Sequence, residues 1–152
     1  MRYCGTLIAV SDMAKAKHFY ETVMEQRVLM DLGVHVSFEG GLSLQSNYPE
    51  LVGHGLLMHE CPNNFQLYFE VEDLDIWQKK IEDVEGIEFI HKTKEYPWGQ
   101  SVMRFYDYDS YIIEVAESME SVAKRFLSQG LSVEETAERT MFPVDYVKSL
   151  AK

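Results

Sequence analysis

The sequence predicts an α+β fold of two βαβββ modules, which together form a curled eight-stranded mixed sheet, or cup, followed by a C-terminal helical extension. Three observations support this prediction: one order of strands and helix occurs twice, apolar and capping residues recur at one spacing, and the last part of the chain has helical patterning. We place a single domain at residues 1–117, with modules at 1–61 and 62–117, and the extension at 118–152.

The first module opens with a strand pattern over residues 2–10. Ser11 and Asp12 are typical of a helix start, because a short acceptor side chain can cap free backbone N–H groups. Apolar residues then recur at three and four from Met13 to Met24, which is typical of an amphipathic helix. The elements that follow are, in order, a strand over 27–32, a hairpin of 34–38 and 42–45 around Gly40-Gly41, a loop over 46–55 and a short strand over 56–59.

The second module repeats this order after a linker at Pro62. We expect a strand over 65–71, a helix that starts at Asp73 and ends before Gly86, a strand over 87–91 and a closing hairpin. The two modules are in register at a spacing of 61 residues: Leu7, Val10, Asp12, Met13, Tyr20 and Val23 correspond to Tyr68, Val71, Asp73, Leu74, Ile81 and Val84. Matching order and spacing favour duplication over coincidence.

The closing hairpin, residues 97–115, contains several of the side chains that could form a functional site. Its strands cover 100–106 and 111–115, and Asp107-Tyr108-Asp109-Ser110 form the turn. Glu114 lies between Ile113 and Val115, so it either faces solvent or points into a cavity. The pattern alone favours solvent, because glutamate is rarely buried without a partner.

The extension is predicted to be helical. Ser118 caps a first helix that Gly130 ends, Ser132 and Glu135 have the form of a capping box, and Pro143 fits the first position of a last helix. Two short helices joined by a turn resemble a helix-turn-helix. Its second helix offers few basic residues, so we expect a docking appendage instead.

Charge limits the classes of partner. Residues 118–152 carry equal numbers of basic and acidic groups, so the whole net charge of −11 lies in residues 1–117. An acidic body argues against nucleic-acid binding, which needs lysine and arginine to replace phosphate counterions. No apolar run is long enough to span a bilayer, and no signal peptide opens the chain. Cys4 and Cys61 lack metal-type spacing, so we expect reduced thiols in a cytoplasmic protein.

The layout resembles the vicinal oxygen chelate superfamily, which includes glyoxalase I, extradiol dioxygenases and bleomycin-resistance proteins. Residues 7–12, 18–20, 69–74, 97–100 and 104–115 carry the resemblance, which covers about residues 3–117. The usual Asp-Pro-Asp-Gly turn of the family has Tyr108 and Ser110 in place of its proline and glycine. Members of this family are mostly dimers, so the resemblance implies a homodimer.

The resemblance also implies a divalent ion held by four His or Glu side chains, two per module. Glu114 matches the last ligand position. The first-strand position falls on Gly5, which has no side chain, and its counterpart falls on Gln66, which offers only a neutral carbonyl oxygen. The remaining position falls near Leu57 or His59.

A metal site of Glu114 and His59 alone is therefore predicted to be degenerate, which disfavours a catalytic Zn, Ni, Fe or Mn ion. Replacement ligands would have to come from His35, His54 or His91, although a single histidine on a strand or loop is more often a surface or packed residue. The cofactor is thus predicted to be none or unknown, with a divalent metal as the less favoured alternative.

The predicted lining of the cup is aromatic, with a few polar groups, as a small-molecule pocket requires. The candidate ligand-binding residues are Trp98, Arg104, Tyr96, Gln45 and Gln66, together with the acid Glu114. Arg104 could bind an anionic group of a ligand or pair with Glu114 across the hairpin. Trp98 could line the pocket or pack in the core.

Three functions follow from these features. The first is a metal-free small-molecule binder of the glyoxalase and bleomycin-resistance kind, whose ligand is unknown. The second is a metal-dependent lyase, isomerase or dioxygenase in which Glu114 binds metal or moves a proton as the catalytic residue. The third is a ligand-sensing regulatory module that acts through the C-terminal helices.

Overall fold

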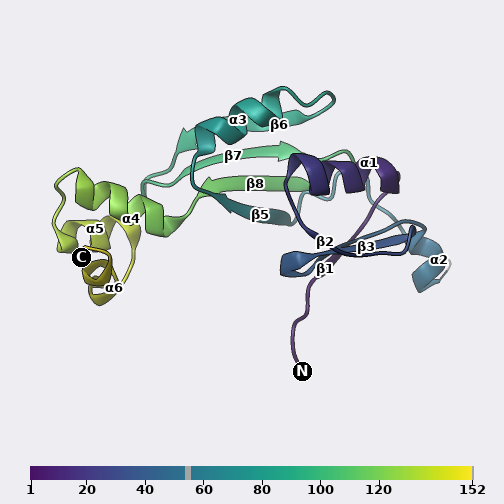
Figure 1. Ribbon diagram of the computed structural model, residues 1–152, viewed down its shortest axis with the longest axis horizontal. Helices are drawn as coiled ribbons and strands as arrows, with labels where there is room; N and C mark the ends of the chain where they lie inside the picture. The colour runs from purple at the N-terminus through teal and green to yellow at the C-terminus, as the bar shows by residue number, and fades with distance from the viewer. Residues whose placement is uncertain (54–55, 152) are drawn as a thin grey trace. The chain divides into compact units, whose positions relative to one another are not determined.

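The structure of the protein is a computed structural model, which describes residues 1–53 and 56–151. The chain divides into two compact units, Met1–Pro62 with Tyr108–Ser110, and Asn63–Asp107 with Tyr111–Lys152. Each unit contains one four-stranded mixed sheet (Figure 1). The predicted α+β class, the two βαβββ modules and the helical extension are confirmed.

The first unit has the strand order β1-β4-β3-β2, in which β1 is parallel to β4 and the other neighbours are antiparallel. Helix α1 begins after Asp12, whose Oδ1 accepts a hydrogen bond from the Lys15 amide at 3.0 Å. The elements are β1 (Thr6–Ala9), α1 (Met13–His18), the π-helical turn η1 (Phe19–Val23), β2 (Val28–Asp31), β3 (His35–Phe38), the 3-10 turn η2 (Glu39–Gly41), β4 (Leu42–Gln45) and α2 (Tyr48–Val52).

One face of this sheet forms the core of the first unit. Alternate residues of the strands are buried, as the period of a half-covered sheet requires. The helix and its π-helical turn contribute an aromatic pair, Phe19 and Tyr20, whose ring centroids are 5.1 Å apart. The buried set is Ile8, Val36, Phe38 and Leu44 from the strands, with Ala16, Phe19, Tyr20 and Met24.

Two predictions for the first unit are wrong. Residues 56–59 form no strand, because β1 pairs with β4 and the four strands already complete the sheet. The apolar residues of this segment are adjacent and do not alternate with polar ones, so they do not define one strand face that could be buried against a core. The predicted loop over 46–55 contains the short helix Tyr48–Val52, which has Pro49 in its first turn, where a missing N–H costs nothing.

The second unit repeats the topology, with strand order β5-β8-β7-β6 and β5 parallel to β8. Asp73 caps the helix as predicted, since its Oδ1 accepts from the Ile76 amide at 3.1 Å. The elements of the module are β5 (Gln66–Val71), α3 (Leu74–Glu82), β6 (Glu88–Glu95), β7 (Ser101–Tyr106) and β8 (Ile112–Glu117). Helix α3 lies against β6, β7 and β8, over the face that buries Ile81, Met103, Phe105, Ile113 and Val115.

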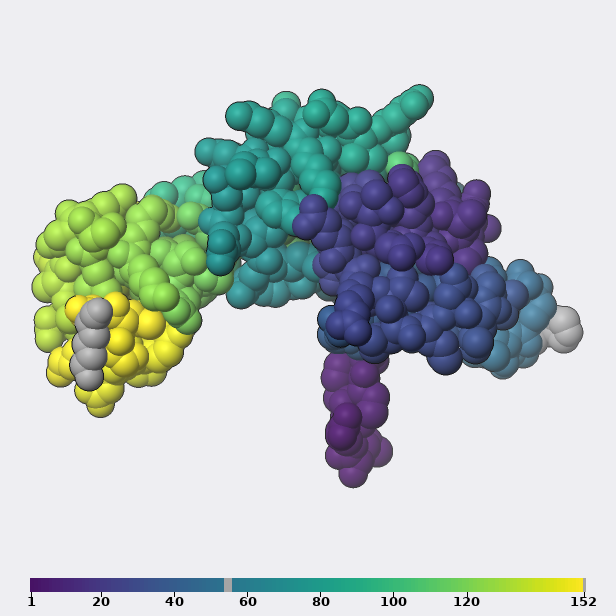
Figure 2. Space-filling view, in the orientation of Figure 1, coloured from purple at the N-terminus to yellow at the C-terminus, as the bar shows by residue number. Residues whose placement is uncertain are grey.

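The extension consists of α4 (Met119–Ser128), α5 (Val133–Thr140) and α6 (Val144–Leu150). Ser118 accepts from the Ser121 amide, and Ser132 and Glu135 form both hydrogen bonds of a capping box, so both predicted caps are confirmed. The three helices gather into one lobe at the end of the second sheet (Figure 2). Phe126 and Val147 are buried in that lobe.

Two further findings concern the whole of the described chain. Within residues 1–53 and 56–151, no helix combines the length and the apolar character needed to cross a membrane. Cys4 and Cys61 are both exposed and free, so neither forms a disulfide.

The turn of the closing hairpin contains a non-glycine residue in a left-handed conformation. The Asp107 amide donates to the Tyr111 carbonyl at 3.0 Å, and Ser110 has φ +63°. A side chain in this region costs about 1–2 kcal/mol, and glycine avoids most of that cost. The family turn that this segment resembles has glycine at this position.

We therefore expect Ser110→Gly to raise the free energy of unfolding by about 0.5–1 kcal/mol, since relief of the left-handed strain exceeds the added entropy of the unfolded glycine. Urea unfolding followed by circular dichroism measures the change. The control is Ser128→Gly, which lies in helix α4 and should destabilise by a similar amount. A loss of stability in Ser110→Gly would contradict the interpretation.

Candidate functional site

The open face of the second sheet carries the predicted acid. Glu114 lies opposite Arg104 on β7 and opposite Tyr68 on β5. Because side chains alternate along a strand, these three residues share the face opposite the core residues Ile113 and Val115. The strand pattern left two orientations open for Glu114 and by itself favoured solvent; the structure has the enclosed one, with only 7% of the residue exposed.

The burial of Glu114 is compensated by two partners. The Arg104 Nη2 forms an ion pair with Glu114 Oε2, and Gln66 Nε2 donates to the same oxygen at 2.8 Å. A mostly buried carboxylate needs such partners, because the loss of hydration would otherwise exclude its charged form. Arg104 therefore pairs with Glu114 across the hairpin, which is one of the two roles its position allows.

The remaining donors of Arg104 organise the surrounding side chains. Its Nε donates to Gln66 Oε1 at 3.2 Å, and its Nη1 donates to the Tyr96 hydroxyl at 2.5 Å. The same Nη1 lies 3.0 Å from His91 Nε2. A guanidinium can only donate, so His91 Nε2 must accept, and Nδ1 carries the proton that is donated to the Lys92 carbonyl at 2.9 Å.

Tyr96 and Trp98, which we call the aromatic wall, stack with ring centroids 4.8 Å apart and an interplanar angle of 21°. Trp98 is half-buried, and its indole Nε1 donates to Gln100 Oε1 at 3.1 Å. Gln100 is buried and donates to the Tyr68 hydroxyl at 3.3 Å and to the Glu117 carbonyl at 2.9 Å. The wall thus connects to the polar cluster through both Tyr96 and Gln100.

Tyr68 stays protonated through the neutral range. Burial, and then its hydrogen bond to Glu70 Oε1 at 2.8 Å, raise the pKa of Tyr68 to about 12. Its hydroxyl therefore donates to Glu70 while it accepts from Gln100. Neither Tyr68 nor Gln100 is among the predicted site residues, although the alternation along β5 places Tyr68 beside Gln66.

The structure brings together most of the predicted site residues, but not all. Glu114, Arg104, Gln66, Tyr96 and Trp98 form one connected network in the second unit. Gln45 and His59 belong to the first unit. Gln45 is buried and accepts from His35 Nδ1 at 3.0 Å, since its own amide donates to the Ser46 carbonyl. His59 is exposed in a segment without regular structure, and His54 lies outside the described residues.

Strand register identifies the counterparts of this network in the first unit. Leu7 and Tyr68 are 61 residues apart; Leu7 lies opposite Ser43, and Tyr68 lies opposite Glu114. Ser43 is therefore equivalent to Glu114. Ser37 lies opposite Ser43, as Arg104 lies opposite Glu114, so the ion pair of the second unit corresponds to two serines in the first.

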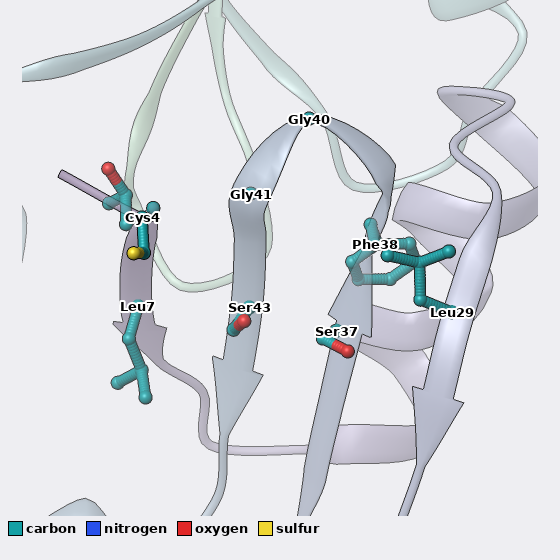
Figure 3. A pocket seen from close by; sticks show the side chains of 10 residues that line it. Cys4, Leu7, Leu29, Ser37, Phe38, Gly40, Gly41 and Ser43 are labelled. Atoms are coloured by element: carbon teal, nitrogen blue, oxygen red, sulfur yellow. The ribbon is translucent and has the colours of Figure 1, made fainter. Parts of the chain in front are cut away.

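An open pocket of about 440 Å³ lies at these serines. Ser37 and Ser43 stand on neighbouring strands, flanked by Leu7 and Leu29 (Figure 3). Gly5 and Gly41 approach closely at its rim: a Cβ on Gly5 would lie 2.0 Å from the Gly41 carbonyl oxygen. Position 5, the counterpart of Gln66, therefore excludes any side chain.

Comparison with known proteins identifies the family. The model of the glyoxalase-like domain family matches residues 3–120, and the chain belongs to this family. No curated protein matches the chain.

Solved structures share the fold. One is a protein of unknown function from Agrobacterium tumefaciens strain C58, with 33% identity over 78% of this chain and 94% of that chain and a TM-score of 0.70. A lactoylglutathione lyase from Agrobacterium tumefaciens has 23% identity over 77% and 93% of the two chains, with a TM-score of 0.59. A glyoxalase/bleomycin resistance protein/dioxygenase from Nocardioides has 19% identity over 77% and 83%, with a TM-score of 0.60.

A double-mutant cycle of Arg104→Met and Glu114→Gln should give a coupling energy of about 1–3 kcal/mol in urea unfolding, because each single change leaves its partner poorly compensated. The control is the exposed pair Arg27–Glu39, with a 2.9 Å contact, which water screens and which should show little coupling. Equal coupling in the two cycles would contradict the structural role of the buried pair.

Proposed function

We propose that this protein is a glyoxalase/bleomycin-resistance-like small-molecule-binding protein with a degenerate metal site. The observation that carries the proposal is the engagement of Glu114, which matches a family ligand position, by the Arg104 guanidinium and the Gln66 amide. A guanidinium beside this carboxylate occupies the role that a cation would have, and its positive charge opposes a divalent ion at the same oxygen.

The other family ligand positions support the same proposal. Gly5 has no room for a side chain, and Ser43, the counterpart of Glu114, is neutral. Gln66 uses both ends of its amide on Glu114 and Arg104. Among residues 1–53 and 56–151, no group of three or more His, Cys, Asp or Glu is arranged to hold a metal ion. The donor set present does not fit the metal that the family implies.

The ligand class follows from the groups that the network presents. The aromatic wall offers a ring surface for stacking. Both contacts of Glu114 described above are made through Oε2, so Oε1 is the oxygen that can accept a hydrogen bond from a ligand N–H or O–H. The surplus of acidic groups in residues 1–117 disfavours anions. We therefore propose a neutral or cationic aromatic ligand with a hydrogen-bond donor, bound by a homodimeric cytoplasmic protein.

Binding can be tested with three probes that differ in one group: 2-naphthol, which has a donor, 2-methoxynaphthalene, which has none, and 2-naphthoate, which is anionic. Ligand-observed NMR should show the strongest binding for 2-naphthol. Trp98→Leu should weaken it about tenfold, equivalent to about 1.4 kcal/mol, through loss of stacking.

The matched control is Trp77→Phe, since Trp77 is the other tryptophan of the chain and lies on helix α3. This change should leave the affinity for 2-naphthol unaltered. Preference for 2-naphthoate, or equal losses in both tryptophan variants, would reject the proposed ligand class.

Metal addition distinguishes the binder from the enzyme hypothesis. We expect Zn²⁺, Ni²⁺, Mn²⁺ or Fe²⁺ at tenfold molar excess to leave the melting temperature unchanged, because a ligand stabilises only a site that it binds. Differential scanning fluorimetry measures the shift, and elemental analysis after dialysis measures retention. One retained ion per chain, lost in Glu114→Gln, would replace the binder hypothesis with a metal-dependent enzyme.

A further inference from the structure

The aromatic wall is carried by a three-residue hairpin loop. Pro97, Trp98 and Gly99 form the loop, and the Tyr96 amide donates to the Gln100 carbonyl at 2.8 Å to close it. The Gly99 amide donates to the Tyr96 carbonyl at 2.8 Å, and Gly99 has φ +86°. A glycine with positive φ after a tight turn is typical of such loops. The loop by itself fixes its own backbone but not its tilt relative to the sheet.

Arg125 of helix α4 holds this loop from the side of the extension. Its Nη2 donates to the Gly99 carbonyl at 2.7 Å and to Glu117 Oε2, at the end of β8, at 3.2 Å. Its Nη1 lies 3.6 Å from Glu95 Oε2, at the end of β6. One planar guanidinium thus joins the loop to the strands on both sides of β7, which a flexible ammonium group cannot do with the same geometry.

Phe126 provides a second, apolar contact with the same glycine. A Cβ on Gly99 would lie 2.1 Å from Phe126 Cζ, so the ring packs directly on the glycine backbone. Phe126 is 1% exposed. The guanidinium carbons of Arg125 and Arg139 lie 5.2 and 4.3 Å from its ring centroid. Ring and guanidinium therefore define where the loop rests.

We infer that helix α4 positions the aromatic wall, with Arg125 and Phe126 as positioning residues for the ligand site. The match to the family domain ends at residue 120, so both residues lie outside it. The geometry of the wall is then set by the extension of this chain and not by the domain alone. The consequence for ligand affinity rests on the proposed function; the positioning of Trp98 does not.

The experiment uses the full chain with Trp77→Phe, which leaves Trp98 as the single tryptophan, and excitation at the red edge of the absorption band avoids the tyrosines. Arg125→Ala is compared with Lys124→Ala, its exposed neighbour on the same helix, which pairs with Glu120 one turn earlier. We expect Arg125→Ala to raise the acrylamide quenching constant of Trp98 at least twofold and to reduce the near-ultraviolet circular dichroism of the stack. Lys124→Ala should change neither. Affinity for 2-naphthol should fall about fivefold in Arg125→Ala alone.

A second pair of variants tests the contact without removing the arginine. Gly99→Ala and Gly130→Ala both place a side chain at positive φ, +86° and +94°, but a Cβ on Gly130 meets nothing within 4 Å. Only Gly99→Ala should alter the quenching of Trp98, since only its methyl group displaces the loop from Phe126.

The outcomes separate the two proposals. Unchanged quenching in both Arg125→Ala and Gly99→Ala overturns the positioning role of α4, whatever the probe binding shows. Altered quenching with no binding of 2-naphthol to the wild-type protein supports the positioning role and rejects the proposed ligand class. Equal changes in Arg125→Ala and Lys124→Ala also overturn the inference, because they would reflect a general loosening of the helix.

Discussion

The ion pair between Arg104 and Glu114 is the interaction on which the open face of the second sheet depends. Glu114 is nearly inaccessible to water, and a carboxylate in that position must be compensated by charge and hydrogen bonds. The two residues face each other on adjacent antiparallel strands, so the backbone register alone brings them together. Once the guanidinium is held there, its other N–H groups orient Gln66, Tyr96 and His91.

Duplication of the fold has not duplicated this chemistry. The same topology in the first unit places Ser37 and Ser43 where the second unit has arginine and glutamate. Without charged side chains to fill the space, that face is hollowed into a pocket. The close backbone contact of Gly5 with Gly41 explains why no larger side chain occupies the rim. The two modules thus share a scaffold while their open faces present different surfaces.

The extension adds a structural demand of its own on the second module. Glu117 ends β8, accepts a hydrogen bond from the Ser101 amide and pairs with Arg125 on the following helix. The end of β8, the loop that carries Gly99 and helix α4 are therefore joined by one set of polar contacts. The glycine at position 99 satisfies two requirements at once, a left-handed backbone and close contact with an aromatic ring.

Local signals in the sequence were sufficient for most of the elements and for four helix caps. Asp12, Asp73, Ser118 and Ser132 each cap a helix, because a side-chain acceptor needs only the next few backbone amides. The spacing of 61 residues identified the duplication, and the alternation of side chains along β8 placed Glu114 on the face opposite Ile113 and Val115. The short helix at Tyr48–Val52 was missed, and the strand at 56–59 was wrong, because short segments carry too little periodicity to decide between alternatives.

The sequence by itself therefore determined the class of fold, the repeat and the residues whose side chains could bind a ligand or take part in a reaction. Only the tertiary structure decided their partners: Arg104 for Glu114, Ser43 as the counterpart of Glu114, and Phe126 for Gly99. These pairings join residues brought together by strand register and helix docking, which depend on contacts across the whole unit. The sequence does not show how much space surrounds a serine or a glycine in the folded chain. That space distinguishes the open pocket of the first unit from the filled face of the second.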